Sequence, residues 1–203
     1  MVHDRMGDPL VVTPSLTQGG LRSARFLAAG TATRIVLTPV VMALVLSGDS
    51  AGLATVLFCA AAATDWIDGR LARRWGVTSK LGSFLDTTAD KLLVSRVLIA
   101  LLAVDRVSPW IVALILGREI VLMAVRGLVA AEGEVMAPSM LGKLKASIQF
   151  VAIALAILRP GDPLGGLYID EWAMIAAAII TVISAADYLM RALPEVIRED
   201  NLA

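Results

Sequence analysis

The sequence predicts an all-α integral membrane protein with six transmembrane helices and a short N-terminal interfacial helix. Hydrophobic residues make up 58% of the 203-residue chain, whereas soluble domains contain roughly 45–50%. They gather in long runs, each near the roughly 20 residues that a helix needs to cross a bilayer core. The chain also carries 18 basic and 18 acidic residues. Because charge inside a membrane segment is costly, the positions of these residues indicate function.

The apolar runs define the elements in order along the chain. Residues 1–20 have no sustained periodicity and no signal-peptide pattern, so a flexible tail is expected. Residues 21–29 predict a short interfacial helix, with Arg22 and Arg25 toward the headgroups. A single domain then covers 21–203. Breaks rich in Gly, Pro and charge separate six predicted helices near 32–48, 51–74, 82–104, 108–132, 141–158 and 171–192.

The distribution of basic residues predicts the orientation. The loops of one side hold only Arg106 and Arg159. The other side holds Arg22, Arg25, Arg70, Arg73, Arg74, Lys80, Lys143, Lys145, Arg191 and Arg198. By the positive-inside rule the second side is cytoplasmic. The single Cys59 excludes an intrachain disulfide framework.

A dense polar stretch joins the second and third predicted helices. On a helix, Asp65 and Asp68 are spaced i,i+3, and Asp86 and Asp90 are spaced i,i+4, so each pair projects from one face. A connection of roughly eight residues makes the two helices antiparallel neighbours and brings the four carboxylates together. One such Asp alone would more often be a solvated helix end. Four on matched faces indicate a site.

Converging carboxylates repel one another unless cations compensate them. Hard oxygen ligands suit Mg²⁺, Mn²⁺ or Ca²⁺, and two such cations form the usual clamp for displacement at phosphorus. We therefore expect two divalent cations, Mg²⁺ or Mn²⁺, bound by Asp65, Asp68, Asp86 and Asp90.

These residues form the pattern D-x2-D-G-x2-A-R-x8-G-x3-D-x3-D, which resembles the signature of the CDP-alcohol phosphotransferases. The resemblance covers about residues 28–192. It implies that Asp90 is a metal ligand and also the general base, and that Gly69, Ala72, Arg73 and Gly82 bind the CDP-lipid. It also implies the substrate CDP-diacylglycerol, a homodimer and an active site on the cytoplasmic side of the plasma membrane.

A further resemblance, to the bacterial phosphatidylglycerophosphate synthases, concerns the acceptor. Its segments include Thr31-x2-Arg34-x4-Pro39, Ala89-Asp90-Lys91, Gly117-Arg118-Glu119, Arg126 and Ser139-x2-Gly142-Lys143-x-Lys145-x3-Gln149. Arg118 and Arg126 lie two turns apart on one helix, and an arginine in a span is tolerated when it binds an anion. With Lys143 and Lys145 they predict a cationic pocket for glycerol 3-phosphate.

Alternatives remain for the pocket and for the acceptor. Arg118 would pair with Glu119 or an Asp of the motif, and the two lysines would follow only from the positive-inside rule. Ala28, Thr87 and Ala146 depart from the synthase pattern. An inositol phosphate acceptor is a second possibility, although those enzymes usually have Arg in place of Lys91. Phosphatidylglycerol, giving cardiolipin, is a third.

Two other classes of protein, an ion-coupled transporter and a membrane scaffold, fit these features less well than an enzyme does. An ion-coupled transporter would have broken helices near the bilayer midplane and internal symmetry, and no repeat is visible here. A membrane scaffold leaves the carboxylate spacing unexplained. The expected partners are therefore the CDP-lipid, a small alcohol phosphate and the bilayer, with no nucleic acid.

Overall fold

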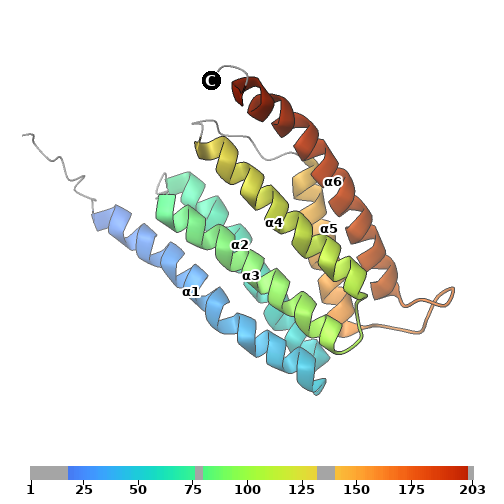
Figure 1. Ribbon diagram of the computed structural model, residues 1–203. Coiled ribbons are helices and arrows are strands. Elements are labelled where there is room, and N and C mark those ends of the chain that lie inside the picture. The colour runs from blue at the N-terminus through green and yellow to red at the C-terminus, as the bar shows by residue number, and fades with distance from the viewer. Residues whose placement is uncertain (1–17, 76–79, 132–139, 201–203) are drawn as a thin grey trace, which may run out of the picture.

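The structure, a computed structural model, describes residues 18–75, 80–131 and 140–200, with side chains described at residue 30 and at 32–64, 91–129 and 140–192. The described residues form six α-helices: α1 (Gln18–Ser47), α2 (Ala51–Trp75), α3 (Lys80–Ala103), α4 (Pro109–Ala131), α5 (Met140–Leu158) and α6 (Ile169–Asp200). Successive helices run in opposite directions along the bundle (Figure 1). The all-helical prediction is confirmed.

The predicted boundaries hold to within a few residues for α2 to α5. Helix α6 continues to Asp200, beyond its predicted end near 192, and α1 differs most. It runs unbroken from Gln18 to Ser47 with Pro39 inside it. The segment 21–29 is therefore the first part of α1 rather than a separate interfacial helix. A lone Gly30 costs a helix only about 1 kcal/mol, which a helix of this length absorbs. Residues 1–17 of the predicted tail lie outside the described residues.

The helices pack in two groups that meet where α2 contacts α5 and where α3 contacts α4 and α5. Helix α1 packs against α2 and α3, α6 packs against α4 and α5, and α2 contacts α5. Several fully buried positions are alanines: Ala54, Ala61, Ala152, Ala156 and Ala177. Small side chains let helix backbones approach closely, as in membrane bundles, where packing drives association. Between α2 and α5, Phe58 and Phe150 place their ring centroids 5.7 Å apart.

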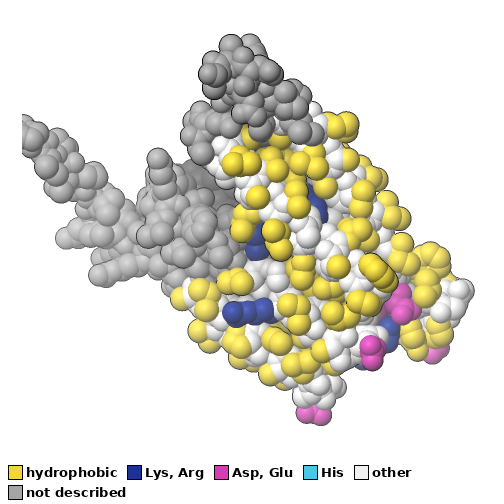
Figure 2. All heavy atoms as spheres, viewed as in Figure 1, with side chains coloured by type: hydrophobic (Ala, Val, Ile, Leu, Met, Phe, Trp, Pro, Cys, Tyr) yellow, Lys and Arg dark blue, Asp and Glu magenta, His cyan; other side chains and the backbone are white. Residues whose placement is uncertain are grey.

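The outer surface of the bundle is apolar. Hydrophobic side chains cover most of the described face in Figure 2, and many large ones are exposed, among them Val36, Val56, Trp110, Ile120 and Val151. Exposed apolar area of this extent marks a surface that faces something other than water. Within the described residues, Met140–Leu158 and Ile169–Ala192 are each long and apolar enough to cross a membrane.

The loop between α5 and α6 lies at the end of the bundle far from the Asp motif, and hydrogen bonds and an ion pair hold it in place. Gly165 and Gly166 both have positive φ, and Leu164 and Leu167 exchange backbone hydrogen bonds around them, as a type I′ turn requires. Arg159 Nε lies 3.4 Å from Asp170 Oδ2, and its guanidinium carbon lies 4.4 Å from the centroid of the Tyr168 ring. Asp170 has no exposed surface. Arg159 therefore compensates a buried carboxylate at the start of α6.

Replacing Arg159 with Met should destabilise the protein by about 3 kcal/mol, because it leaves the Asp170 carboxylate buried and uncompensated. Thermal unfolding of the purified protein in detergent should show a clearly lower midpoint. Adding Asp170→Asn should restore much of the loss. Arg191→Met is the matched control, since Arg191 pairs with Asp187 on the surface and such pairs contribute under about 1 kcal/mol. Equal effects of the two arginine changes would contradict this prediction.

Candidate functional site

The Asp motif lies on two consecutive helices. Asp65 and Asp68 are in α2, and Asp86 and Asp90 are in α3, so the helical spacings assumed from the sequence are confirmed for the backbone. Helix α2 extends to Trp75 and α3 begins at Lys80, so both helices are slightly longer at these ends than predicted. The side chains of these four residues, and those of Gly69, Ala72, Arg73 and Gly82 on the same helices, lie outside the described residues. Their convergence and their roles therefore remain predictions.

A cavity of about 270 Å³ lies among α3, α4, α5 and α6. All four residues predicted to bind an acceptor phosphate line it, namely Arg118, Arg126, Lys143 and Lys145. Other lining residues are Lys91, Ser95, Glu119, Ala146, Gln149, Ser184 and Tyr188. Lys91 directly follows Asp90 in α3. The cavity therefore begins on α3 where the Asp motif ends.

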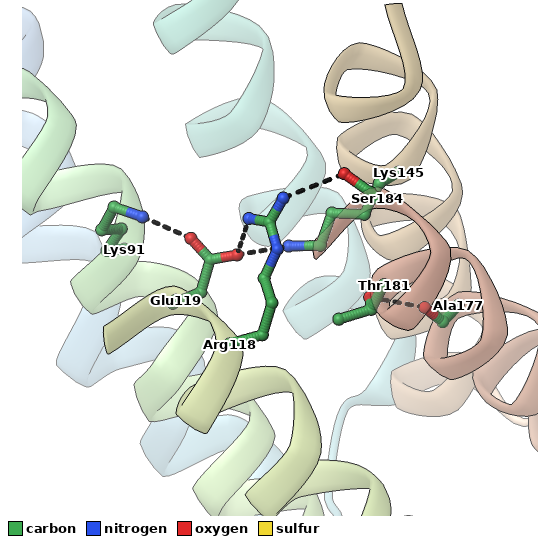
Figure 3. Close-up of polar contacts among 7 residues, drawn as sticks. All are labelled: Lys91, Arg118, Glu119, Lys145, Ala177, Thr181 and Ser184. Atoms are coloured by element: carbon green, nitrogen blue, oxygen red, sulfur yellow. Dashed lines mark hydrogen bonds and ion pairs between the residues drawn. The ribbon is translucent and has the colours of Figure 1, made fainter. Parts of the chain in front are cut away.

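Glu119 is the central carboxylate of this cavity (Figure 3). Its Oε1 accepts hydrogen bonds from Arg118 Nη1 at 2.7 Å and from Lys145 Nζ at 2.6 Å. Its Oε2 accepts a hydrogen bond from Lys91 Nζ. The three cations come from α4, α5 and α3 respectively, so a single side chain joins three helices. The alternative that Arg118 pairs with Glu119 is therefore correct, and Arg118 lines the cavity as well.

Arg118 also connects α4 to α6. Its Nη2 donates a hydrogen bond to Ser184 Oγ at 3.0 Å (Figure 3), and Ser184 is 1% exposed. A planar guanidinium has donors on both sides, so Arg118 holds Glu119 and Ser184 at once. This double attachment fixes the direction of its side chain.

The remaining two cations lie at the more open side of the cavity. Arg126 and Lys143 are exposed, and no carboxylate in the described part of the chain pairs with either. The Arg126 guanidinium carbon lies 5.2 Å from the centroid of the Tyr188 ring, a cation–π distance. Arg126 and Lys143 therefore keep their charges available to a ligand.

The charges and buried polar atoms of the cavity indicate an anionic, polar ligand. Its described lining holds five cations, Lys91, Arg118, Arg126, Lys143 and Lys145, against the carboxylate of Glu119, which leaves a surplus of four positive charges. Arg118 Nε, Gln149 Oε1 and Tyr188 Oη are buried and have no hydrogen-bond partner among the described residues. Such atoms are costly unless a ligand or water satisfies them. A small phosphate compound has the matching charge and oxygens.

Sequence reasoning did not assign several of these residues to the site. Lys91, Glu119 and Gln149 stand in the segments that resemble a family pattern, so their positions were a signal that could have been used. Ser184 and Tyr188 had no such signal. They lie far along the chain in α6 and reach the cavity because α6 packs against α4 and α5.

Comparison with known proteins identifies the family. The family model for CDP-alcohol phosphatidyltransferase matches residues 28–183. The chain is 36% identical to the CDP-diacylglycerol–glycerol-3-phosphate 3-phosphatidyltransferase of Bacillus subtilis, over 79% of this chain and 91% of the relative. It is 38% identical to the enzyme of the same name from Escherichia coli, over 68% and 78%. It is also 38% identical to a probable phosphatidylglycerophosphate synthase of Mycobacterium tuberculosis, over 88% and 86%.

The match covers the helical body, from α1 to the middle of α6, and it includes the Asp motif and the cavity residues of α3, α4 and α5. The chain is therefore a transferase that belongs to the CDP-alcohol phosphatidyltransferase family.

Proposed function

We propose that this enzyme transfers the phosphatidyl group of CDP-diacylglycerol to glycerol 3-phosphate, giving phosphatidylglycerophosphate and CMP. The observation that carries the proposal is the cationic cavity that starts at Lys91, directly after Asp90 of the motif. An acceptor phosphate in this cavity would lie beside the proposed reaction centre, because Lys91 is the residue after Asp90 in α3. The names of the relatives from Bacillus subtilis and Escherichia coli agree with this reaction.

The cavity also favours a small acceptor over a lipid. Pockets for drug-sized ligands measure about 300–1,000 Å³, and this cavity measures about 270 Å³. Phosphatidylglycerol would need a second lipid groove, so the cardiolipin reaction is disfavoured. Lys91, where inositol phosphate enzymes usually have Arg, lines the cavity. Ala146, which departs from the synthase pattern, also lines the cavity. Positions 91 and 146 therefore bear on the choice between glycerol 3-phosphate and an inositol phosphate as the acceptor.

In the proposed reaction, Asp90 removes the proton from the acceptor hydroxyl. The hydroxyl oxygen then forms a bond to the phosphorus that carries the diacylglycerol. The bond between that phosphorus and the bridging oxygen of the diphosphate breaks, and CMP leaves. Gly69, Ala72, Arg73 and Gly82 would bind the CDP-lipid.

The donor set of the motif suits hard cations, since it consists of four carboxylates at same-face spacings on helices. Asp65, Asp68, Asp86 and Asp90 would hold two divalent cations, Mg²⁺ or Mn²⁺. When bound, these cations neutralise the diphosphate and stabilise the CMP leaving group. The other groups proposed to act on the substrates are residues of this protein.

The proposed setting is the plasma membrane, crossed by all six helices, with the site on the cytoplasmic side. The apolar exterior and the two helices of spanning length support it. Helix α4 carries Arg118, Glu119 and Arg126 within its length, and the network inside the bundle shields the first two. A homodimer remains an expectation from the family resemblance.

Asp68→Asn and Asp86→Asn should each abolish transfer, because each removes a metal-binding charge with little change in volume. The measurement is CMP release from CDP-diacylglycerol, with glycerol 3-phosphate and Mg²⁺ or Mn²⁺, using purified protein. Asp162→Asn, in the loop after α5, is the control and should keep full activity. Near-normal turnover of either motif variant would refute the metal assignment.

Asp90→Asn should retain CDP-lipid binding and lose turnover by about 10²–10⁴-fold, the usual contribution of a general base. Binding is measured by titration with the CDP-lipid, and turnover by CMP release. If the variant keeps more than about a tenth of the wild-type rate, Asp90 is only a metal ligand.

Arg118→Ala and Arg126→Ala should weaken use of glycerol 3-phosphate by tens-fold or more, because losing a charged contact that the bound phosphate shields from water costs about 2–5 kcal/mol. The KM for CDP-diacylglycerol should change far less, and free glycerol should not be used. Arg96→Ala is the matched control, since Arg96 is an exposed arginine of α3 that does not line the cavity. Unchanged kinetics for glycerol 3-phosphate in both variants would mean that the arginines are structural.

A further inference from the structure

Glu119 differs from the other charged residues of the cavity because it has the sign of the proposed ligand. An acidic side chain weakens phosphate binding if it acts only through its own charge. Its contacts indicate another role, since its two oxygens hold Lys91, Arg118 and Lys145 together (Figure 3).

Three cations do not converge in a water-poor cavity without a counter-charge. The side chains of Lys145 and Arg118 are only 7% and 11% exposed, and that of Lys91 is 21% exposed. Like charges at this spacing repel strongly where water does not screen them. Glu119 offsets this repulsion and keeps the three positive groups directed at one point.

The three cations depend on Glu119 to different degrees. Arg118 has a second attachment, its hydrogen bond to Ser184. Lys91 and Lys145 have no other side-chain partner in the described part of the chain. Without the carboxylate, the two flexible lysines have no group to direct them into the cavity, whereas Arg118 stays in place.

We infer that Glu119 is a positioning residue for the acceptor phosphate: it holds Lys91 and Lys145 in the cavity so that they and Arg118 converge on a phosphate. The inference rests on the proposed function, because it takes glycerol 3-phosphate as the acceptor. In this role the carboxylate acts through the cations that it holds, and the proposed proton transfer belongs to Asp90.

The test is Glu119→Gln, which keeps the size of the side chain and removes its charge. In steady-state kinetics with each substrate varied in turn, the KM for glycerol 3-phosphate should rise about tenfold or more. The KM for CDP-diacylglycerol should stay within about threefold, because that substrate uses other residues. Glycerol 3-phosphate should also raise the thermal unfolding midpoint of the wild type in detergent, without CDP-lipid, and should fail to do so for the variant.

The matched control is Glu171→Gln. Glu171 also pairs with an arginine, Arg159, but it lies in the first turn of α6 and does not line the cavity. This variant should leave both KM values unchanged, so a general effect of losing an ion pair would be recognised.

A double-mutant cycle with Lys145→Met tests whether Glu119 acts through Lys145. If it does, the rise in KM of Glu119→Gln with Lys145→Met falls well below the product of the two single effects. Removing both charges of a buried pair is tolerated better than removing one, so the double variant serves if Glu119→Gln does not fold. In that case a KM below that of Lys145→Met alone would overturn the inference, because the carboxylate would then weaken phosphate binding, whereas the release of Lys91 should raise the KM further.

The outcomes separate this inference from the proposed function. If the wild type does not use glycerol 3-phosphate, the proposed function fails, and this inference fails with it. If the wild type uses it and Glu119→Gln has an unchanged KM, only the positioning role is wrong. A lower KM in Glu119→Gln would show that the carboxylate competes with the phosphate, which also overturns the inference.

Discussion

The need to compensate charge inside an apolar bundle governs the architecture around the cavity. Helices α3, α4 and α5 each contribute a cation to Glu119, and Arg118 extends the network to Ser184 of α6. Each of these groups would be costly if buried alone. Together they form a polar centre among helices whose other contacts are made by apolar side chains. Because one carboxylate faces three cations, the network pairs each of these cations and still leaves positive charge for a ligand.

Helix α3 connects the two parts of the site. Its N-terminal part carries Asp86 and Asp90 of the motif, and the residues that follow line the cavity with Lys91, Val94 and Ser95. Two neighbouring residues, Asp90 and Lys91, thus belong to regions of opposite charge. An enzyme that joins an anionic acceptor to a diphosphate lipid needs this change of sign over a short distance, since hard cations suit the diphosphate and basic side chains suit the acceptor phosphate.

The opposite end of the bundle has a structural role in the described residues. Arg159 compensates the buried Asp170, and Arg106 Nη1 donates to the carbonyl oxygen of Ala156 in the last turn of α5. A cation at the C-terminal end of a helix is favourable because the final carbonyls have no partner within the helix. Arg106 and Arg159, the basic residues in the loops of the less basic side, therefore stabilise helix ends.

The sequence by itself determined the helix class, most helix boundaries and the motif, because long apolar runs and same-face spacings are local properties of the chain. It also indicated Arg118, Arg126, Lys143 and Lys145, through their cost in a span and through the family resemblance. The continuity of α1 through residues 21–29 was missed, since a single Gly30 in an otherwise helical run is a weak signal. Only the tertiary structure showed that Glu119 holds Lys91, Arg118 and Lys145, and that Ser184 and Tyr188 reach the same cavity. Those contacts depend on how α6 packs against α4 and α5, and packing between distant segments has no local signature in the sequence.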